Sequence, residues 1–166
     1  MNSLLYQFAQ YNLWAHQRLT ACILALDSEQ QHKEIASSFD SLYKTVTHVW
    51  FATTAWWNRL HYLPAPASGD PFNASMKELS EALLMLDENF VLWVESRDEV
   101  SIAEQFTYRN FRGQEYTEPA NEILMHIFNH GTYHNGQIVT MLHYAGADSI
   151  PATDFIEWHR QTNKKS

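Results

Sequence analysis

Hydrophobic residues recur every three or four positions along four long stretches of the chain, and polar or proline-containing segments separate these stretches. This spacing places the apolar side chains of each stretch on one face of an α-helix. We therefore predict four amphipathic helices, at residues 3–26, 41–61, 73–97 and 119–145. Because each helix has to bury its apolar face against another element, the simplest all-α arrangement is a four-helix bundle with those faces inward.

The connection between the third and fourth predicted helices has a different pattern. Two short stretches rich in aromatic and β-branched residues, at 106–108 and 115–117, flank a polar segment that contains Gly113. This pattern predicts either a small β-hairpin or an extended crossover loop, and it leaves the order of the helices open. A short terminal helix is predicted at 154–160. Because the chain has 166 residues and no internal repeat, we expect one domain over residues 1–166.

Composition narrows the classes of function. Hydrophobic residues make up 45% of the chain, which is typical of a globular protein, and the formal net charge is −8. Such a chain lacks the surplus of lysine and arginine that neutralises phosphates, so we expect no binding to nucleic acid or to an anionic membrane surface. No apolar run approaches the roughly 20 residues that span a bilayer. The single cysteine and the absence of a signal-peptide pattern at the start predict a cytoplasmic protein.

Two histidines in the fourth predicted helix suggest a metal site. His130 and His134 lie one helical turn apart, and both fall on the apolar stripe of the helix. Two imidazoles in this arrangement can bind one metal ion, although a pair of hydrogen-bonded core histidines would give the same pattern. His126 lies a further turn away, about 12 Å from His134 along a straight helix, which is too far for all three to share one ion. A third ligand must therefore come from another helix.

Histidines elsewhere in the chain, or a carboxylate, are candidates for this third ligand; the histidines are His16, His48, His61, His143 and His159. His48 is the best placed, because it lies near the middle of the second predicted helix and one residue from its apolar stripe. Metal sites in helical bundles are built from facing helices in this way. A histidine on the helix surface or in the core is the alternative interpretation of His48.

Other catalytic signatures do not occur in the sequence. Gly131 follows His130, so the chain lacks the glutamate of the H-E-x-x-H proteases. A di-iron bundle needs two Glu-x-x-His motifs, whereas we find only residues 29–32, outside the long helices. A glycine-rich phosphate loop and a G-x-S-x-G elbow are also missing, which disfavours nucleotide-dependent and serine-hydrolase chemistry.

Three segments resemble, in the right order, the motifs of the DinB-like family, and together they extend over the whole chain. They are Tyr11–Leu19 with its Trp14, His48–Trp56, and Asn129–Gln137 with its two histidines. Each motif alone is weak, and the ordered set is fairly specific. Members of the family are four-helix bundles in which three histidines bind a divalent ion. The resemblance therefore implies that His48, His130 and His134 are the metal ligands.

The resemblance also implies a chemistry, although it identifies no catalytic residue. Characterised relatives include transferases and isomerases that use low-molecular-weight thiols. We therefore expect a metal-dependent, thiol-dependent S-transferase or isomerase that acts on a small-molecule substrate, with zinc or nickel as the ion and a low-molecular-weight thiol as cosubstrate. A homodimer is the implied assembly. The alternatives are a non-catalytic metal-binding bundle with a role in stress, and a metal-dependent hydrolase.

Two positions depart from the family's pattern. Many members carry an acidic residue where this chain has Thr53, and an arginine where it has Asn135. Both positions lie next to ligand motifs, so these substitutions bear on activity more than on metal binding. Gln137, one turn after His134, and Asn129 are candidates to orient a ligand or to bind substrate.

Overall fold

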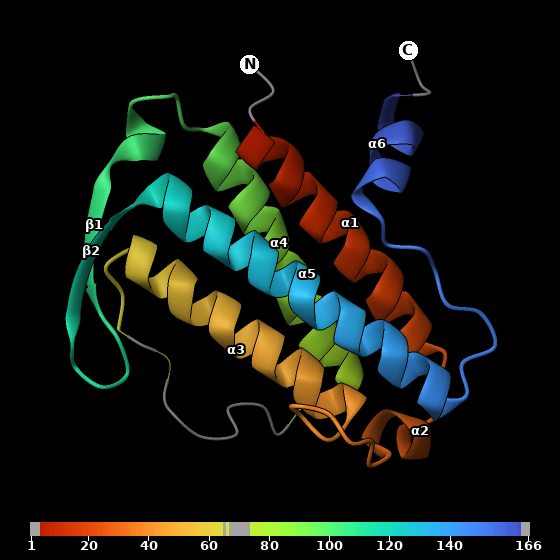
Figure 1. Ribbon diagram of the computed structural model, residues 1–166. Coiled ribbons are helices and arrows are strands. Elements are labelled where there is room, and N and C mark those ends of the chain that lie inside the picture. The colour runs from red at the N-terminus through yellow and green to blue at the C-terminus, as the bar shows by residue number, and fades with distance from the viewer. Residues whose placement is uncertain (1–3, 65, 67–73, 164–166) are drawn as a thin grey trace.

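The computed structural model describes residues 4–64, 66 and 74–163 and is mostly helical (Figure 1). Its four long helices are α1 (Leu4–Leu24), α3 (Leu42–Leu60), α4 (Met76–Glu95) and α5 (Ala120–Ala145). The shorter helices are α2 (Ser28–His32), α6 (Phe155–Asn163) and the 3₁₀ helix η1 (Ser101–Ala103). Within these described ranges, no helix combines the length and the apolar character that crossing a membrane requires.

Capping residues explain why the long helices begin and end close to the predicted positions. Ser41 and Ser75 precede α3 and α4, and each side chain accepts a hydrogen bond from a backbone N–H in the first turn. Gly146 ends α5 with a φ of 84°, a left-handed conformation that glycine adopts without strain. The first helix ends two residues earlier than predicted, at Leu24, and the predicted start of the third at residue 73 lies outside the described residues.

The four long helices lie side by side, with α1 and α5 running one way and α3 and α4 the other (Figure 1). Helix α1 packs against α4 and α5, and α3 packs against the same two helices. The Tyr43 hydroxyl near the start of α3 donates to the carbonyl oxygen of Ala74 just before α4, so these two helices start at the same end. The end of α3 and the start of α4 therefore lie at opposite ends of the helices, whereas the sequence permitted a crossover in the following connection.

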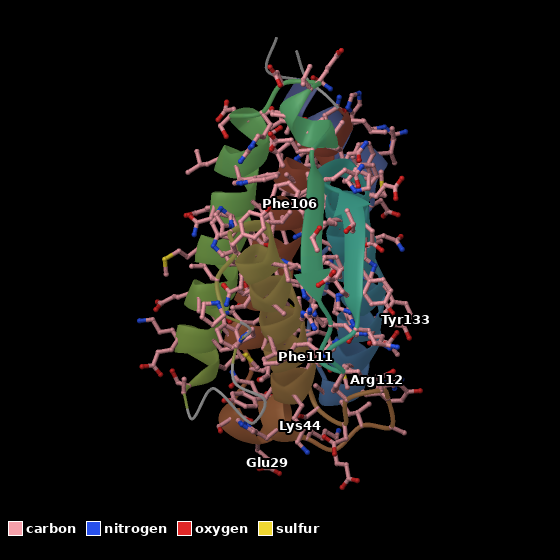
Figure 2. The ribbon with its side chains drawn as sticks, turned by 90° about the vertical axis from the view of Figure 1, so that its left-hand side faces the viewer. Glu29, Lys44, Phe106, Phe111, Arg112 and Tyr133 are labelled. Carbon is pink, nitrogen blue, oxygen red and sulfur yellow. The ribbon has the colours of Figure 1, made fainter. Side chains whose placement is uncertain are left out.

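That following connection, between α4 and α5, contains a β-hairpin, one of the two alternatives predicted for it. Strand β1 (Gln105–Arg109) pairs antiparallel with β2 (Glu115–Pro119), with Thr107 opposite Thr117. Phe111 at the tip stacks on Phe51 of α3, with 5.6 Å between the ring centroids. The hairpin thus runs alongside α3, and Figure 2 shows it in front of that helix with Phe111 near its lower end.

Buried polar residues separate the apolar interior into two clusters. One cluster lies where α1 and α5 end and includes Leu19 and Ile138, and the other lies where they begin and includes Ala9 and Phe128. The buried polar residues near the junction of the clusters come from all four long helices: Asn12, His16, Thr53, Asp87, His134 and Asn135. Because burying a polar group without a partner is costly, the contacts of this layer need individual explanation.

Candidate metal centre

The structure brings His48 of α3 together with His130 and His134 of α5. The Nε2 atom of His130 lies 3.4 Å from Nε2 of His48 and 3.1 Å from Nε2 of His134. One ring nitrogen from each of the three lies within 4.8 Å of the other two. The three side chains singled out by the sequence therefore form one cluster between two antiparallel helices.

The remaining candidate histidines lie in other surroundings. His126 is exposed and stacks loosely on His130, with 6.0 Å between the ring centroids. His61 follows the last residue of α3, and its Nδ1 donates to a carbonyl oxygen one turn earlier in that helix. His16 is buried and contacts a carboxylate of α4 instead. Two are exposed, His143 and His159. In the described part of the chain, none of these joins the three-histidine cluster.

The distances within the cluster fit a single transition-metal ion. Two nitrogens that bind one zinc ion at about 2.0–2.1 Å are no more than about 4.2 Å apart. The two measured Nε2 separations, 3.4 and 3.1 Å, are below this limit. Among the described residues, the cluster contains imidazoles and no carboxylate or thiolate. Imidazole donors suit zinc, nickel, copper or iron better than magnesium or calcium, which prefer oxygen.

The surroundings of the cluster keep its imidazoles neutral. Burial, and to a smaller extent the neighbouring histidines, lower the pKa of His48 and of His130 to about 4. Burial also lowers the pKa of His134, while a hydrogen bond to Gln137 acts in the opposite direction. At neutral pH all three rings are therefore uncharged, and a neutral imidazole retains the lone pair with which it binds a metal.

Gln137 determines which nitrogen of His134 carries the proton. Its Nε2 atom donates to the hydroxyls of Tyr133 and Ser38, each at 3.1 Å. Its Oε1 atom therefore faces the His134 ring and accepts a hydrogen bond from Nδ1 at 2.7 Å. The lone pair of His134 is left on Nε2, the atom that faces His130. Such a contact is what orients metal-binding histidines in many proteins, and it is the role considered for Gln137 from the sequence.

Aromatic rings cover part of the cluster. Phe39, between α2 and α3, stacks on His48 with 4.1 Å between the ring centroids and 21° between the planes. Tyr133 meets His134 edge-on, with 5.0 Å between the centroids. These rings exclude water from one side of the imidazoles, which contributes to their low pKa values. Phe39 lies outside the long helices, so the helical spacing of the sequence gave no signal for it.

A cavity of about 320 Å³ lies beside Gln137, between α5 and the segment that precedes α3. Its lining is uncharged and includes Ile35, Tyr133, Gly136 and Met141. An extra Cβ atom at Gly136 would have no heavy atom within 4 Å, so this glycine opens onto free space. The cavity therefore offers room for an uncharged group of a small molecule, next to the residue that orients His134.

Comparison with known protein families gives a match over nearly the whole chain. The model of the DinB family matches residues 1–165. The chain belongs to the DinB family. The protein DinB of Bacillus subtilis (strain 168) is 28% identical to it over 163 residues, which cover 93% of each chain. The resemblance inferred from the three sequence motifs is thereby confirmed.

Solved structures of DinB-like proteins have the same fold as this DinB-family chain. The crystal structure of a DinB-like protein from Bacillus cereus ATCC 10987 has a TM-score of 0.65 and 20% identity, covering 87% of this chain and 94% of that one. A DinB-like protein from Bacillus subtilis has a TM-score of 0.61 and 11% identity, covering 89% and 98%. At these identities the likeness establishes the fold and carries no information about substrate.

Thr53 and Asn135, the two positions at which the sequence is expected to depart from the family pattern, are both buried. The Thr53 hydroxyl donates to the backbone oxygen of Val49 at 2.8 Å, within its own helix. The Asn135 side chain is 2% exposed, and its amide has no hydrogen-bond partner among the described residues. Asn129, the other sequence candidate for orienting a ligand, is exposed.

Proposed function

We propose that this DinB-family protein binds one divalent transition-metal ion through Nε2 of His48, His130 and His134, within a four-helix bundle. The observation that carries the proposal is the convergence of three neutral imidazoles from two helices, with Nε2 separations of 3.4 and 3.1 Å. Gln137 supports it, because this residue leaves the lone pair of His134 on Nε2. Without a shared cation, one Nε2 proton on His130 can serve only one of the two Nε2 atoms that face it at a time.

The proposed site is of the catalytic kind. Three protein ligands leave a four-coordinate ion with an open position, whereas structural zinc sites are closed by four ligands. A bound ion of this kind lowers the pKa of a water or thiol that it binds. Gln137 orients one ligand, and Phe39 and Tyr133 keep water from one side of the rings. The cavity of about 320 Å³ beside Gln137 provides space for a small substrate.

The class of reaction follows from the family. A thiol-dependent S-transferase or isomerase with zinc or nickel, acting as a homodimer, is the activity that the DinB resemblance favours. In this proposal a low-molecular-weight thiol gives up its proton, its sulfur forms a bond to a small electrophile, and the transferase reaction releases the leaving group as an anion. The uncharged lining of the cavity favours an uncharged group on one of the two substrates. A hydrolase would use the same site with water in place of the thiol.

The test uses metal-loaded protein, a panel of low-molecular-weight thiols and a chloronitroaromatic electrophile. We expect a rate that requires both the thiol and the ion, that is lost in His134→Ala, and that is retained in His143→Ala. His143 lies on the same helix and is exposed, so its replacement controls for loss of a histidine as such. Metal-dependent turnover of an ester without any thiol would favour the hydrolase instead.

A non-catalytic metal-binding bundle is the second candidate. Thr53 and Asn135 favour it, because both side chains are buried at positions where many relatives carry charged groups. The cobalt-substituted protein distinguishes the two candidates by its visible spectrum. A spectrum that changes when a thiol is added indicates an open coordination position and supports the enzyme. A spectrum that does not respond, together with no metal-dependent rate across the panel, supports the non-catalytic protein.

A further inference from the structure

A buried histidine and aspartate, which the proposed metal site does not use, connect α1 and α4. His16 and Asp87 are each 2% exposed, and Nδ1 of His16 donates to Oδ2 of Asp87 at 2.6 Å. Nδ2 of Asn12 donates to Oδ1 of the same carboxylate at 2.9 Å. Both oxygens of Asp87 are therefore hydrogen-bonded, and a buried carboxylate is stabilised in this way.

Four polar atoms near this pair are buried and have no hydrogen-bond partner among the described residues. They are Asn12 Oδ1, His16 Nε2, Asn135 Oδ1 and Asn135 Nδ2. The three side chains are 2–4% exposed, so bulk water does not reach them. An unpaired buried polar group costs about 1–3 kcal/mol. These four atoms therefore need hydrogen-bond partners from outside the protein chain.

Gly131 shows that two of these atoms face the interhelical space between α1 and α5 at the same turn of α5. A Cβ atom on Gly131 would overlap Asn12 Oδ1 and would lie 3.8 Å from His16 Nε2, so both atoms face the same point of α5. Helices α1 and α5 run in the same direction (Figure 1), so one turn further along, Asn135 is level with His16. The unpartnered atoms thus come from neighbouring turns of two packed helices.

We propose that this space is an internal water site. One water molecule donates its two protons to Asn12 Oδ1 and His16 Nε2 and accepts a hydrogen bond from Asn135 Nδ2. In the neutral form of His16, the Nδ1 proton is donated to Asp87, so Nε2 is free to accept a hydrogen bond. Three hydrogen bonds are what a buried water molecule typically makes. Asn135 Oδ1 offers an acceptor for a further water molecule.

A metal cation fits this space less well than water does. Asp87 has no free oxygen to offer a cation, because His16 and Asn12 occupy both. The remaining donor set would be one imidazole and two amide oxygens without a compensating negative charge, and the amide N–H groups of Asn135 would repel a cation. Water, which both donates and accepts, satisfies all three side chains.

The water site and the three-histidine cluster share two turns of α5. Gly131 directly follows His130, and Asn135 directly follows His134. A water molecule bound to Asn135, Asn12 and His16 therefore links the turns that carry two of the proposed ligands to α1, and through Asp87 to α4. This site requires no metal, so it stands whether or not the cluster binds an ion.

Oxygen-17 magnetic relaxation dispersion, which counts water molecules with long residence times, tests the proposal on the metal-free protein. The wild type is compared with Asn135→Leu, which fills the same space with an apolar side chain. The control is Asn129→Leu, the same change at an exposed position of the same helix. We expect Asn135→Leu to lose the signal of at least one long-lived water molecule and Asn129→Leu to keep it. Equal signals in all three proteins would overturn the proposal.

A high-resolution crystal structure of the wild type keeps the proposal testable if Asn135→Leu does not fold. Electron density for a water molecule within about 2.6–3.2 Å of both His16 Nε2 and Asn12 Oδ1 is the expected result. A direct hydrogen bond between Asn135 and His16, with no such density, would show that the side chains satisfy one another and would refute the water site.

Discussion

The two faces of α5 use histidine in opposite ways. On one face, His130 and His134 meet His48, and three imidazoles share a space that contains no carboxylate among the described residues. On the neighbouring face, α5 packs against His16, whose imidazole is buried and hydrogen-bonded to Asp87. The role of a buried histidine thus depends on the group with which its imidazole forms hydrogen bonds.

A carboxylate accepts the hydrogen bond that a buried imidazole donates, whereas a group of neutral imidazoles cannot provide hydrogen bonds to all of its own ring nitrogens. The His16–Asp87 contact pairs a donor with an acceptor at 2.6 Å. In the cluster, burial lowers the pKa of His48 and His130 to about 4, so the rings are uncharged and their Nε2 atoms face one another. The first arrangement stabilises the fold, and the second is suited to an external cation.

Removal of the Asp87 carboxylate should have the largest effect on the stability of the protein. Asp87→Ala leaves His16 Nδ1 and Asn12 Nδ2 buried without their acceptor, and each unpaired group costs about 1–3 kcal/mol, so we expect the free energy of unfolding to fall by about 2–6 kcal/mol. Urea denaturation followed by circular dichroism measures this change. Glu88→Ala, at the exposed neighbouring position, should stay within about 0.5 kcal/mol of the wild type. Equal small changes in both variants would show that the buried pair is not a structural contact.

Acid should destabilise the metal-free protein through the cluster of His48, His130 and His134. In the unfolded chain these side chains take up protons near pH 6.5, but in the folded protein the pKa of His48 and of His130 is about 4. Between these values the unfolded state binds more protons, so stability is present above pH 6.5 and is lost as the pH falls toward 4. We expect a loss of roughly 2 kcal/mol after allowance for the partial exposure of the rings.

Denaturation of the metal-free protein at a series of pH values checks this prediction. His48→Gln removes one of the titrating groups, so its stability should fall less than that of the wild type over the same interval. His143→Gln, at an exposed position, should follow the wild type. A His48→Gln profile parallel to that of the wild type would mean that the cluster does not titrate as described.

Gln137 should affect metal affinity more than fold stability. Gln137→Leu removes the acceptor for Nδ1 of His134, so we expect the affinity for zinc to fall by about 10–100-fold. Competition with a chromophoric chelator measures the affinity. Gln137→Glu keeps an acceptor and should retain most of the affinity, and Gln17→Leu, exposed on α1, should not change it. An unchanged affinity in Gln137→Leu would remove this residue from the site.

Replacement of two glycines on α5 by alanine should change the stability of the protein in opposite directions. At Gly131 an added Cβ would overlap Asn12, whose side chain is held by Asp87, so we expect Gly131→Ala to destabilise the protein by about 1–2 kcal/mol. At Gly136 nothing lies within 4 Å, and alanine should stabilise the helix by up to about 1 kcal/mol. Thermal unfolding gives both values. Stabilisation by both changes would contradict the close approach of α1 to Gly131.

Local patterns in the sequence were sufficient to predict the long helices and the pair of histidines on α5. Ser41 and Gly146 mark helix ends because their side chain or backbone has a specific capping role. His130 and His134 lie one turn apart in the same helix, so their proximity follows from helix geometry alone. His48 was added through its position in the second helix and through the family resemblance.

The buried polar layer could not be predicted in the same way. His16 and Asp87 lie 71 residues apart, and the pattern of apolar residues does not reveal a polar pair that is satisfied across two helices. An apolar stripe along the first helix would include Leu4, which is 57% exposed, and would omit Asn12 and His16, which are buried. Which helices pack together, and in which direction, had to come from the structure.

Metal analysis of the purified, untagged protein tests the central claim most directly. Wild type, His130→Ala and His143→Ala are measured after incubation with zinc, nickel, manganese or iron(II) salts and removal of excess metal. We predict about one equivalent of zinc or nickel per chain in the wild type and in His143→Ala, and none in His130→Ala. No bound metal in the wild type under any of these conditions would contradict the account and would identify His48, His130 and His134 as hydrogen-bonded core residues.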